Sequence, residues 1–256
     1  MGDVTALTGF NGFLGSAIRV ALLENHDVLT IGRRGADIQW DLANPLAPPL
    51  MDCSAIVHCA WAVAPRSQRV TDMNMAGSLA LLDAARAADV PLVFVSTLSA
   101  TAATRSRYGR SKLLVEENVL AYRRGRVIRP GVVRDSDGSM GMLSQALQRI
   151  ASLPVRVSIS PPPRVPVVGL ERTVLAVTDA IRAEGGPASQ DLVDEWVDLD
   201  ELMASMTNGE SRQRRLTIPS TLVTSACIVS QRLPRLRDLS DSWLGLTDAA
   251  RGTTSR

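Results

Sequence analysis

"VTALTGFNGFLG", residues 4–15, decides the fold. Residues 4–9 form a short apolar run that ends in glycine, which is typical of a buried strand. From Phe13 to Glu24 the apolar residues recur at helical spacing. A glycine turn between a strand and a helix lets the backbone approach a pyrophosphate, to which the helix N-terminus presents free N–H groups and a positive dipole. The stretch therefore predicts a dinucleotide-binding turn.

The rest of the first half alternates strand and helix patterns. Apolar runs predict strands, and helical periodicity separates them. A parallel sheet covered by helices on both faces has strands that are apolar throughout, as these are. We therefore expect an α/β fold with a doubly wound parallel sheet of the Rossmann type, whose ligands bind at the carboxyl ends of the strands. The predicted strands are 27–34, 55–60, 91–97 and 126–133, and the predicted helices are 73–89 and 108–124.

After Asp135 the pattern loosens. We expect a helix over 139–151, a strand in "RVPVVGL" (164–170) and a helix over 171–184 that rejoins the main sheet. The predicted organisation is a dinucleotide-binding core with a smaller C-terminal substrate-binding region. The core is 1–137, rejoined by 165–185, and the smaller region is 138–164 with 186–256.

Composition excludes several classes of protein. Of 256 residues, 45% are hydrophobic and 21% are charged, which is typical of a globular chain. The net charge of +2, with basic residues spread along the chain, gives no reason to expect a nucleic-acid partner. The three cysteines have no metal-binding spacing, so we expect no metal site. An odd number of cysteines is also a poor disulfide framework, so we expect a reducing, cytoplasmic setting. We find no signal peptide and no membrane-length apolar segment.

The glycines of the turn are spaced Gly-x3-Gly-x2-Gly, which differs from the commonest dinucleotide fingerprint. Their position, after the first strand and before a helix, makes the signal strong. A plain tight turn is the alternative interpretation. The residues that we expect to contact the cofactor here are Gly9, Phe10, Asn11, Gly12, Phe13, Leu14 and Gly15.

The chain contains one lysine, Lys112, beside 27 arginines, and it lies four residues after Tyr108, one of two tyrosines. On a helix these two side chains share a face. A tyrosine has an unperturbed pKa of about 10, so its anion must be stabilised if it is to act at neutral pH. An adjacent ammonium stabilises the anion by charge. The pair therefore predicts an acid–base tyrosine, Tyr108, supported by Lys112, whose amine can also bind ribose hydroxyls of the cofactor. A surface lysine that follows a tyrosine by chance is the alternative.

This glycine spacing, together with Tyr108-x3-Lys112, resembles the extended short-chain dehydrogenase/reductases, the NAD-dependent epimerase/dehydratase group. Further stretches are similar in order along nearly the whole chain: "IVHCAW", "NMAGSLALLDAAR", "FVST", "IRPGVV" and "RVPVVGLERTVLAV". The resemblance implies a dinucleotide-dependent enzyme. It does not identify a substrate.

The resemblance also implies roles for single residues. It implies that the Thr97 hydroxyl, supported by Ser96, binds the substrate carbonyl, with Ser99 as the runner-up. The alternative is that hydroxyls at a strand end merely satisfy backbone groups. From its place within a predicted strand, and not from the resemblance, His58 is expected to be a packed core residue rather than a catalyst, and Cys59 beside it a buried small hydrophobe. Asn74 either positions the active-site helix or caps a helix. The remaining expected cofactor contacts are Asp41 and Leu42 at the adenine, Cys59, Ala60, Trp61 and Asn74, and Pro130, Gly131 and Val132 beside the nicotinamide.

The end of the second strand, "TIGRRG", indicates which cofactor binds. Arg33 and Arg34 stand where an NAD-binding protein of this architecture carries an acid for the ribose 2′-hydroxyl. A guanidinium pairs with a phosphate through two charged hydrogen bonds. We therefore expect NADP rather than NAD, although an arginine-rich chain can place arginines there by accident.

The predicted activity is that of an NAD(P)-dependent oxidoreductase, with hydride transfer between the nicotinamide and a carbonyl or alcohol carbon of a small molecule. Leu98 and Ser99 replace the Asp-Glu pair of sugar-nucleotide dehydratases, which disfavours dehydration. The short segment from Thr97 to Tyr108 disfavours a bulky sugar nucleotide. An epimerase with retained cofactor and a non-catalytic dinucleotide sensor are the alternatives, and whether the chain forms a homodimer is open.

Overall fold

The structure is a computed structural model of the chain. The residues that it describes are 3–44, 46–62, 67–141, 155–182, 186–205, 214–230 and 237–252.

A parallel sheet of seven strands forms the centre of the larger part of the molecule. The chain starts in the middle of the sheet and builds outward to one edge, then crosses back over the first strand and builds toward the other edge. The order across the sheet is β10 (Ser189–Leu192), β6 (Gly125–Pro130), β5 (Leu92–Val95), β4 (Ala55–His58), β1 (Val4–Thr8), β2 (Asp27–Gly32) and β3 (Ile38–Gln39).

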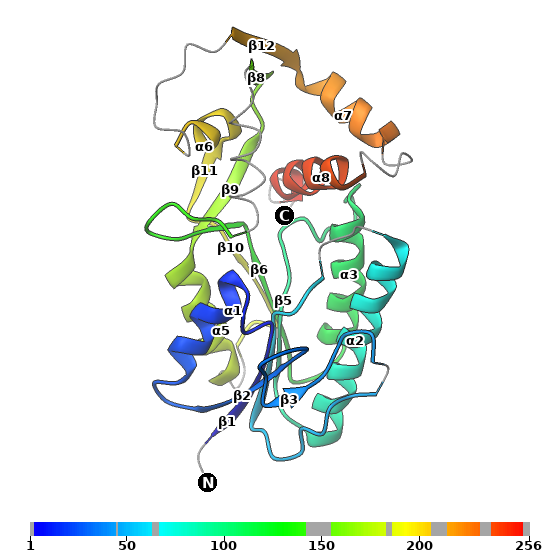
Figure 1. Cartoon of the computed structure of the whole chain (residues 1–256), viewed down its shortest axis with the longest axis vertical. Helices are drawn as coiled ribbons and strands as arrows, with labels where there is room; N and C mark the ends of the chain where they lie inside the picture. Colours follow the sequence, from blue (N-terminus) through cyan, green and yellow to red (C-terminus); the bar gives the residue numbers. More distant parts are fainter. Residues whose placement is uncertain are drawn as a thin grey trace.

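Helices cover both faces of this sheet (Figure 1). α1 (Phe13–Leu22) and α5 (Leu170–Arg182) lie on one face, and α2 (Gln68–Ala88) and α3 (Arg107–Leu120) lie on the other. Each face buries its own apolar cluster. Ile18, Val57 and Val177 belong to the first cluster, and Ile56, Leu81 and Phe94 belong to the second. The doubly wound parallel fold expected from the sequence is confirmed.

The helices α2 and α3 each have a serine at the N-cap position. The Ser67 side chain accepts a hydrogen bond from the Val70 N–H, and the Ser106 side chain accepts one from the Gly109 N–H. Such caps satisfy N–H groups that have no partner within the helix. α1 has no side-chain cap at Gly12. Its free N–H groups therefore stay available at the glycine turn.

A smaller part lies beyond the carboxyl ends of the central strands (Figure 1). One of its sheets has three strands, with β9 (Arg164–Gly169) parallel to β7 (Val132–Arg134) and antiparallel to β11 (Glu195–Asp198). The other pairs β8 (Val155–Ser160) with β12 (Arg214–Pro219). The helices of this part are α6 (Leu199–Ser205), α7 (Ser220–Ser230) and α8 (Arg237–Gly252).

Several sequence expectations need correction. The predicted strand 126–133 is two strands in different sheets, since the chain leaves the large sheet at Gly131. The predicted strand at 164–170 pairs in the small sheet, so in this segment the helix α5, and not the strand, packs against the large sheet. The polar strand β10, within the segment 186–256 assigned to the small region, is the edge strand of the large sheet.

The helix predicted over 139–151 falls, from residue 142 on, outside the described residues. The division into two domains stays a prediction.

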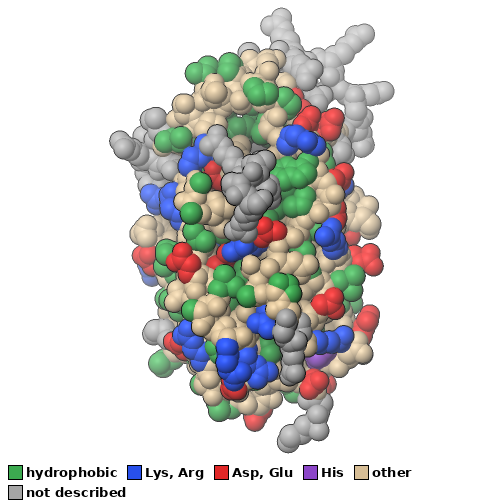
Figure 2. Space-filling model, turned by 180° about the vertical axis from the view of Figure 1, so that it is seen from behind, with side chains coloured by type: hydrophobic (Ala, Val, Ile, Leu, Met, Phe, Trp, Pro, Cys, Tyr) green, Lys and Arg blue, Asp and Glu red, His purple; other side chains and the backbone are tan. Residues whose placement is uncertain are grey.

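Among the described residues, no helix combines the length and the apolar character that a membrane-spanning segment needs. Acidic and basic side chains are interspersed over the face shown in Figure 2. This distribution accords with the near balance of 28 basic and 26 acidic residues.

The closest backbone approach in the turn gives a stability prediction. A Cβ at Gly15 would lie 2.1 Å from the Gly9 carbonyl oxygen, and backbone atoms cannot move aside cheaply. We expect Gly15→Ala to lower the free energy of unfolding by about 1 to 3 kcal/mol, the usual cost of overpacking. Gly245→Ala in α8 is the control, since its Cβ meets only side-chain atoms, at 3.6 Å or more. Thermal unfolding of both variants tests this, and a Gly15→Ala protein as stable as wild type would contradict it.

Candidate active site

Two adjoining cavities lie at the carboxyl ends of β1 and β4. The chain builds outward in opposite directions from this pair of strands, and ligands of open α/β sheets bind at such a switch point. The larger cavity has a volume of about 690 Å³ and the smaller about 270 Å³. Both are lined by Gly9, Gly12, Cys59 and Trp61, so they flank the glycine turn.

The glycine turn allows close backbone approach on both sides. Gly9 has a φ of +75°, a conformation that favours glycine, and a Cβ there would lie 2.7 Å from the Ala60 nitrogen. The Gly12 N–H donates to the Gly9 carbonyl at 2.9 Å and closes the turn. The result is an open backbone surface at the start of α1. Such a surface fits a pyrophosphate.

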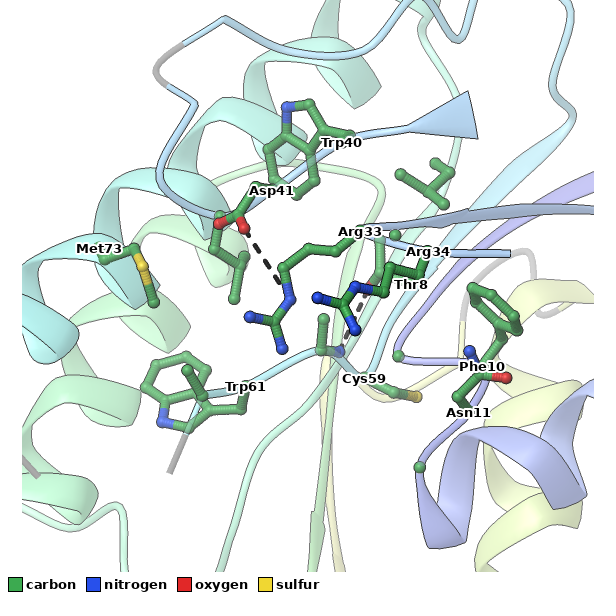
Figure 3. A pocket seen from close by; sticks show the side chains of 17 residues that line it. Thr8, Phe10, Asn11, Arg33, Arg34, Trp40, Asp41, Cys59, Trp61 and Met73 are labelled. Atoms are coloured by element: carbon green, nitrogen blue, oxygen red, sulfur yellow. Dashed lines mark hydrogen bonds and ion pairs between the residues drawn. The ribbon is translucent and has the colours of Figure 1, made fainter. Parts of the chain in front are cut away.

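Residues at the end of β2 line the larger cavity (Figure 3). The side chains of Arg33 and Arg34 both point into it, and the Arg33 guanidinium lies 3.9 Å from the Asp41 carboxylate. Trp40 and Leu42 complete the wall beside Asp41. Two guanidinium groups and one carboxylate give this cavity a net positive charge. Phe10, Asn11 and Leu42, which were expected to contact the cofactor, also line this cavity.

The smaller cavity brings together the residues expected to carry the chemistry. Thr97, Tyr108 and Lys112 line it, although they come from the end of β5 and from α3. Phe13, Leu14 and Gly15 line its other side, and Pro130 and Gly131 its far end. Val132 packs in the small region instead, and its neighbour Val133 lines the cavity. Successive residues of a strand face opposite sides, which accounts for this difference.

The Lys112 ammonium is buried beneath aromatic rings. Its side chain reaches from α3 to the Val95 carbonyl, to which Nζ donates at 2.6 Å. Lys112 is 3% exposed, and burial lowers its pKa to about 7. Nζ lies 4.4 Å from the centroid of the Trp61 ring and 4.8 Å from that of Phe94. Lys112 is thus held on the cavity side of α3, one turn after Tyr108.

Tyr108 lies in the first turn of α3, which is held by the C-terminal helix. The Asp241 carboxylate accepts from the Arg107 N–H at 2.6 Å and from the Tyr108 N–H at 3.3 Å. Seven residues on, Asp248 accepts from the Arg105 N–H at 2.6 Å and from the Ser106 N–H at 3.2 Å. Both acids are 2% exposed. The small part of the molecule therefore fixes the backbone on which Tyr108 is mounted.

The hydroxyls at the end of β5 differ in their access to the cavity. Thr97 and Ser96 line it, whereas Ser99 is 2% exposed and is not among its lining residues. The Ser99 hydroxyl lies 3.3 Å from the Thr97 hydroxyl. The Ser96 hydroxyl is buried without a hydrogen-bond partner in the described structure. The geometry favours Thr97 over Ser99 as the hydroxyl that meets a ligand.

His58 belongs to a buried chain of hydrogen bonds. The Ser78 hydroxyl donates to the Asn74 carbonyl at 2.7 Å, so it accepts from the His58 Nε2–H at 2.8 Å. His58 Nδ1 then accepts from the Thr8 hydroxyl at 2.7 Å, which in turn accepts from the Ala60 N–H at 3.2 Å. Burial lowers the His58 pKa to about 3, which keeps the ring neutral. His58 is thus a packed core residue, as expected.

The same chain of hydrogen bonds ends on the loop that carries Trp61. The Asn74 side chain accepts from the Ala62 N–H and donates to the Ala62 carbonyl, both at 2.8 Å. Asn74 lies within α2 and caps no helix. It therefore positions the loop after β4 rather than facing either of the two cavities. Cys59 lines both cavities, and burial raises the pKa of its thiol to about 12.

Several residues of the site were not identified from the sequence. Trp40 and Val133 line the cavities, and Thr8 and Ser78 carry the buried hydrogen bonds. Asp241 meets α3 from 133 residues away. The alternation of faces along the strand "GVVR" could have indicated Val133. Nothing local in the sequence indicates the contact of Asp241.

The geometry fits a dinucleotide. Two cavities flank a glycine turn whose helix N-terminus has no side-chain cap. Arginines line the larger cavity, and a hydroxyl, a phenol and an ammonium line the smaller one. Among the described residues, no group of three or more His, Cys, Asp and Glu side chains is placed to hold a metal ion.

Comparisons with known proteins agree with this geometry. The model of the NAD dependent epimerase/dehydratase family matches residues 5–136, more than half of the 256-residue chain. None of the curated proteins matches the chain in sequence.

Solved structures share the fold at low sequence identity. ADP-L-glycero-D-manno-heptose-6-epimerase of Helicobacter pylori is 16% identical, with a TM-score of 0.66 over 86% of this chain and 85% of that one. dTDP-glucose 4,6-dehydratase of Bacillus anthracis, in complex with NAD, is 15% identical, with a TM-score of 0.66 over 85% of each chain. dTDP-4-dehydrorhamnose reductase of the same organism, in complex with NADP, is 14% identical, with a TM-score of 0.66 over 85% of each chain.

The family match covers the glycine turn, the ends of β1, β4 and β5, and the helix that bears Tyr108 and Lys112. The structural neighbours share the doubly wound sheet around which these residues are arranged. The chain belongs to the NAD-dependent epimerase/dehydratase family of enzymes.

Proposed function

We propose that the chain is an NADP-dependent oxidoreductase that reduces a carbonyl group of a small molecule or oxidises the corresponding alcohol. The observation that carries this proposal is the meeting of Thr97, Tyr108 and Lys112 in one cavity beside the glycine turn. A hydroxyl, a phenol and an ammonium in one cavity can bind a carbonyl oxygen and exchange a proton with it.

The two cavities suggest how the cofactor would lie. The adenosine half would occupy the larger cavity, between Arg33, Arg34 and the loop of Asp41 and Leu42. The pyrophosphate would cross the glycine turn, and the nicotinamide half would lie between Leu14, Pro130 and Thr97 in the smaller cavity. When bound, the nicotinamide supplies or accepts the hydride.

The protein side chains would handle the oxygen and its proton. In reduction the Thr97 hydroxyl holds the carbonyl oxygen, and the Tyr108 hydroxyl gives that oxygen its proton. In oxidation Tyr108 takes the proton back. The Lys112 ammonium favours the phenolate by charge, because an opposite charge nearby stabilises an anion. The short separation of Tyr108 and Lys112 along α3 supports this role, since Nζ lies 5.6 Å from the centroid of the Tyr108 ring.

An epimerase is a second candidate, favoured by the family match. Such an enzyme would keep its cofactor bound, remove a hydride and return it, with no net redox change. Purified protein distinguishes the two, because an epimerase carries dinucleotide through purification and a reductase consumes added NADPH. A purely cofactor-sensing protein has no use for the assembled Thr97, Tyr108 and Lys112.

Substitution of the acid–base pair tests the chemistry. We expect Tyr108→Phe and Lys112→Met each to reduce turnover by about 10²- to 10⁴-fold, the usual contribution of general acid–base catalysis, without unfolding the protein. A panel of carbonyl substrates followed by NADPH absorbance identifies the substrate and measures the loss.

The control is the other tyrosine, Tyr122, whose hydroxyl bonds the Ala85 and Val90 carbonyls in the core. Tyr122→Phe should lose stability but keep turnover per folded molecule. Near-wild-type turnover of Tyr108→Phe would end this mechanism.

The cofactor preference has its own test. We expect wild type to bind NADP more tightly than NAD, because Arg33 and Arg34 face the adenosine cavity and would pair with a 2′-phosphate. In Arg33→Ala/Arg34→Ala, NADP should weaken by at least about tenfold, since a charged hydrogen bond contributes roughly 1.5 to 3 kcal/mol, while NAD changes little. Calorimetric dissociation constants for both cofactors measure this. Tighter binding of NAD by wild type would refute it.

A further inference from the structure

We infer that Trp61 is a positioning residue whose ring face holds Lys112 in place in its ammonium form. This inference rests on the proposed catalytic role of Lys112. It concerns a residue that touches the lysine rather than the reacting atoms.

The surroundings of Nζ carry the inference. Within the described residues the ammonium makes one hydrogen bond, to the Val95 carbonyl. Three ring faces also lie near the ammonium: Trp61 with its centroid at 4.4 Å, Phe94 at 4.8 Å and Tyr108 at 5.6 Å. A cation within about 6 Å of an aromatic centroid is attracted to the negative ring face, and tryptophan gives the strongest attraction. Trp61 is also the nearest of the three rings.

The ring faces oppose a strong desolvation effect. Burial disfavours the ammonium and lowers the pKa of Lys112 to about 7, so small changes in its surroundings change its charge near neutral pH. The titratable groups around it contribute less. Glu116 favours the ammonium but is already engaged by Arg129 at 2.5 Å, whereas the Cys59 thiol, whose pKa is raised to about 12, and the buried His58 ring are uncharged near neutral pH. An aromatic ring face stabilises the Lys112 ammonium against desolvation without placing another charged group in the site.

Trp61 is held in place for this task by the buried hydrogen bonds on either side of it. Ala60 is fixed by the Thr8 hydroxyl and Ala62 by the Asn74 amide. The Trp61 ring also meets the Tyr108 ring edge-on, with centroids 6.2 Å apart and planes at 89°. One indole ring therefore contacts both members of the proposed acid–base pair. Phe94 differs because it is wholly buried in the core against His58.

The chain allows a direct test, because Lys112 is its only lysine and ¹⁵N-lysine labelling gives one side-chain signal. The protein would be produced with ordinary, mono-, di- and trifluorinated tryptophan, and Lys112 would be titrated by NMR without ligand. Fluorine weakens the negative ring face while nearly preserving the shape of the ring. We expect the Lys112 pKa to fall stepwise with fluorination, by about half a unit to one unit in total.

The control uses Trp61→Phe with the same set of tryptophans, because the chain has three other tryptophans. In that variant fluorination should leave the Lys112 pKa unchanged. A pKa that does not respond to fluorination in wild type, or that responds equally in Trp61→Phe, would overturn the inference. Neither result depends on turnover. If the proposed reaction were wrong but this inference correct, the protein would consume no NADPH while the Lys112 pKa still responded to fluorination.

Discussion

The burial of one ammonium group is the constraint on which the site depends. Lys112 is removed from water at the end of β5, where desolvation lowers its pKa to about 7. The site offsets this with the Val95 carbonyl and three ring faces. A guanidinium at this position would need more room and more acceptors than one carbonyl and three rings provide. The need for a compact cation accounts for a lysine, rather than an arginine, at position 112.

Neighbouring elements hold Trp61 and Tyr108 in place around Lys112. The buried hydrogen bonds from Ala60 through His58 to Asn74 fix the loop that bears Trp61. The carboxylates of α8 fix the turn that bears Tyr108. These two supports come from opposite ends of the chain. The small part of the molecule therefore contributes to the geometry of the proposed catalytic pair as well as covering it.

The central sheet and the core of the site were predictable because their signals are local. The glycine turn, the apolar strands and the spacing of Tyr108 and Lys112 each lie within a few residues of sequence. β10 was not identified because an edge strand such as "SQDL" has one buried residue and no apolar run. The split at Gly131 and the contact of Asp241 with α3 depend on long-range packing. Trp61 was expected to contact the cofactor, but its contact with Lys112 depends on the fold.

The most direct test of the account is the response of the Lys112 ¹⁵N signal to NADPH, whose reduced nicotinamide ring carries no charge. If the cofactor crosses the glycine turn into the smaller cavity, its negatively charged phosphates come nearer to Nζ and its ribose hydroxyls can accept hydrogen bonds from it, so both favour the ammonium. The signal should then shift saturably with NADPH, and the Lys112 pKa should rise from about 7. Calorimetry on the same sample would establish that NADPH binds. A Lys112 signal and pKa that stay unchanged at saturating NADPH would contradict the placement of the cofactor and the site built around it.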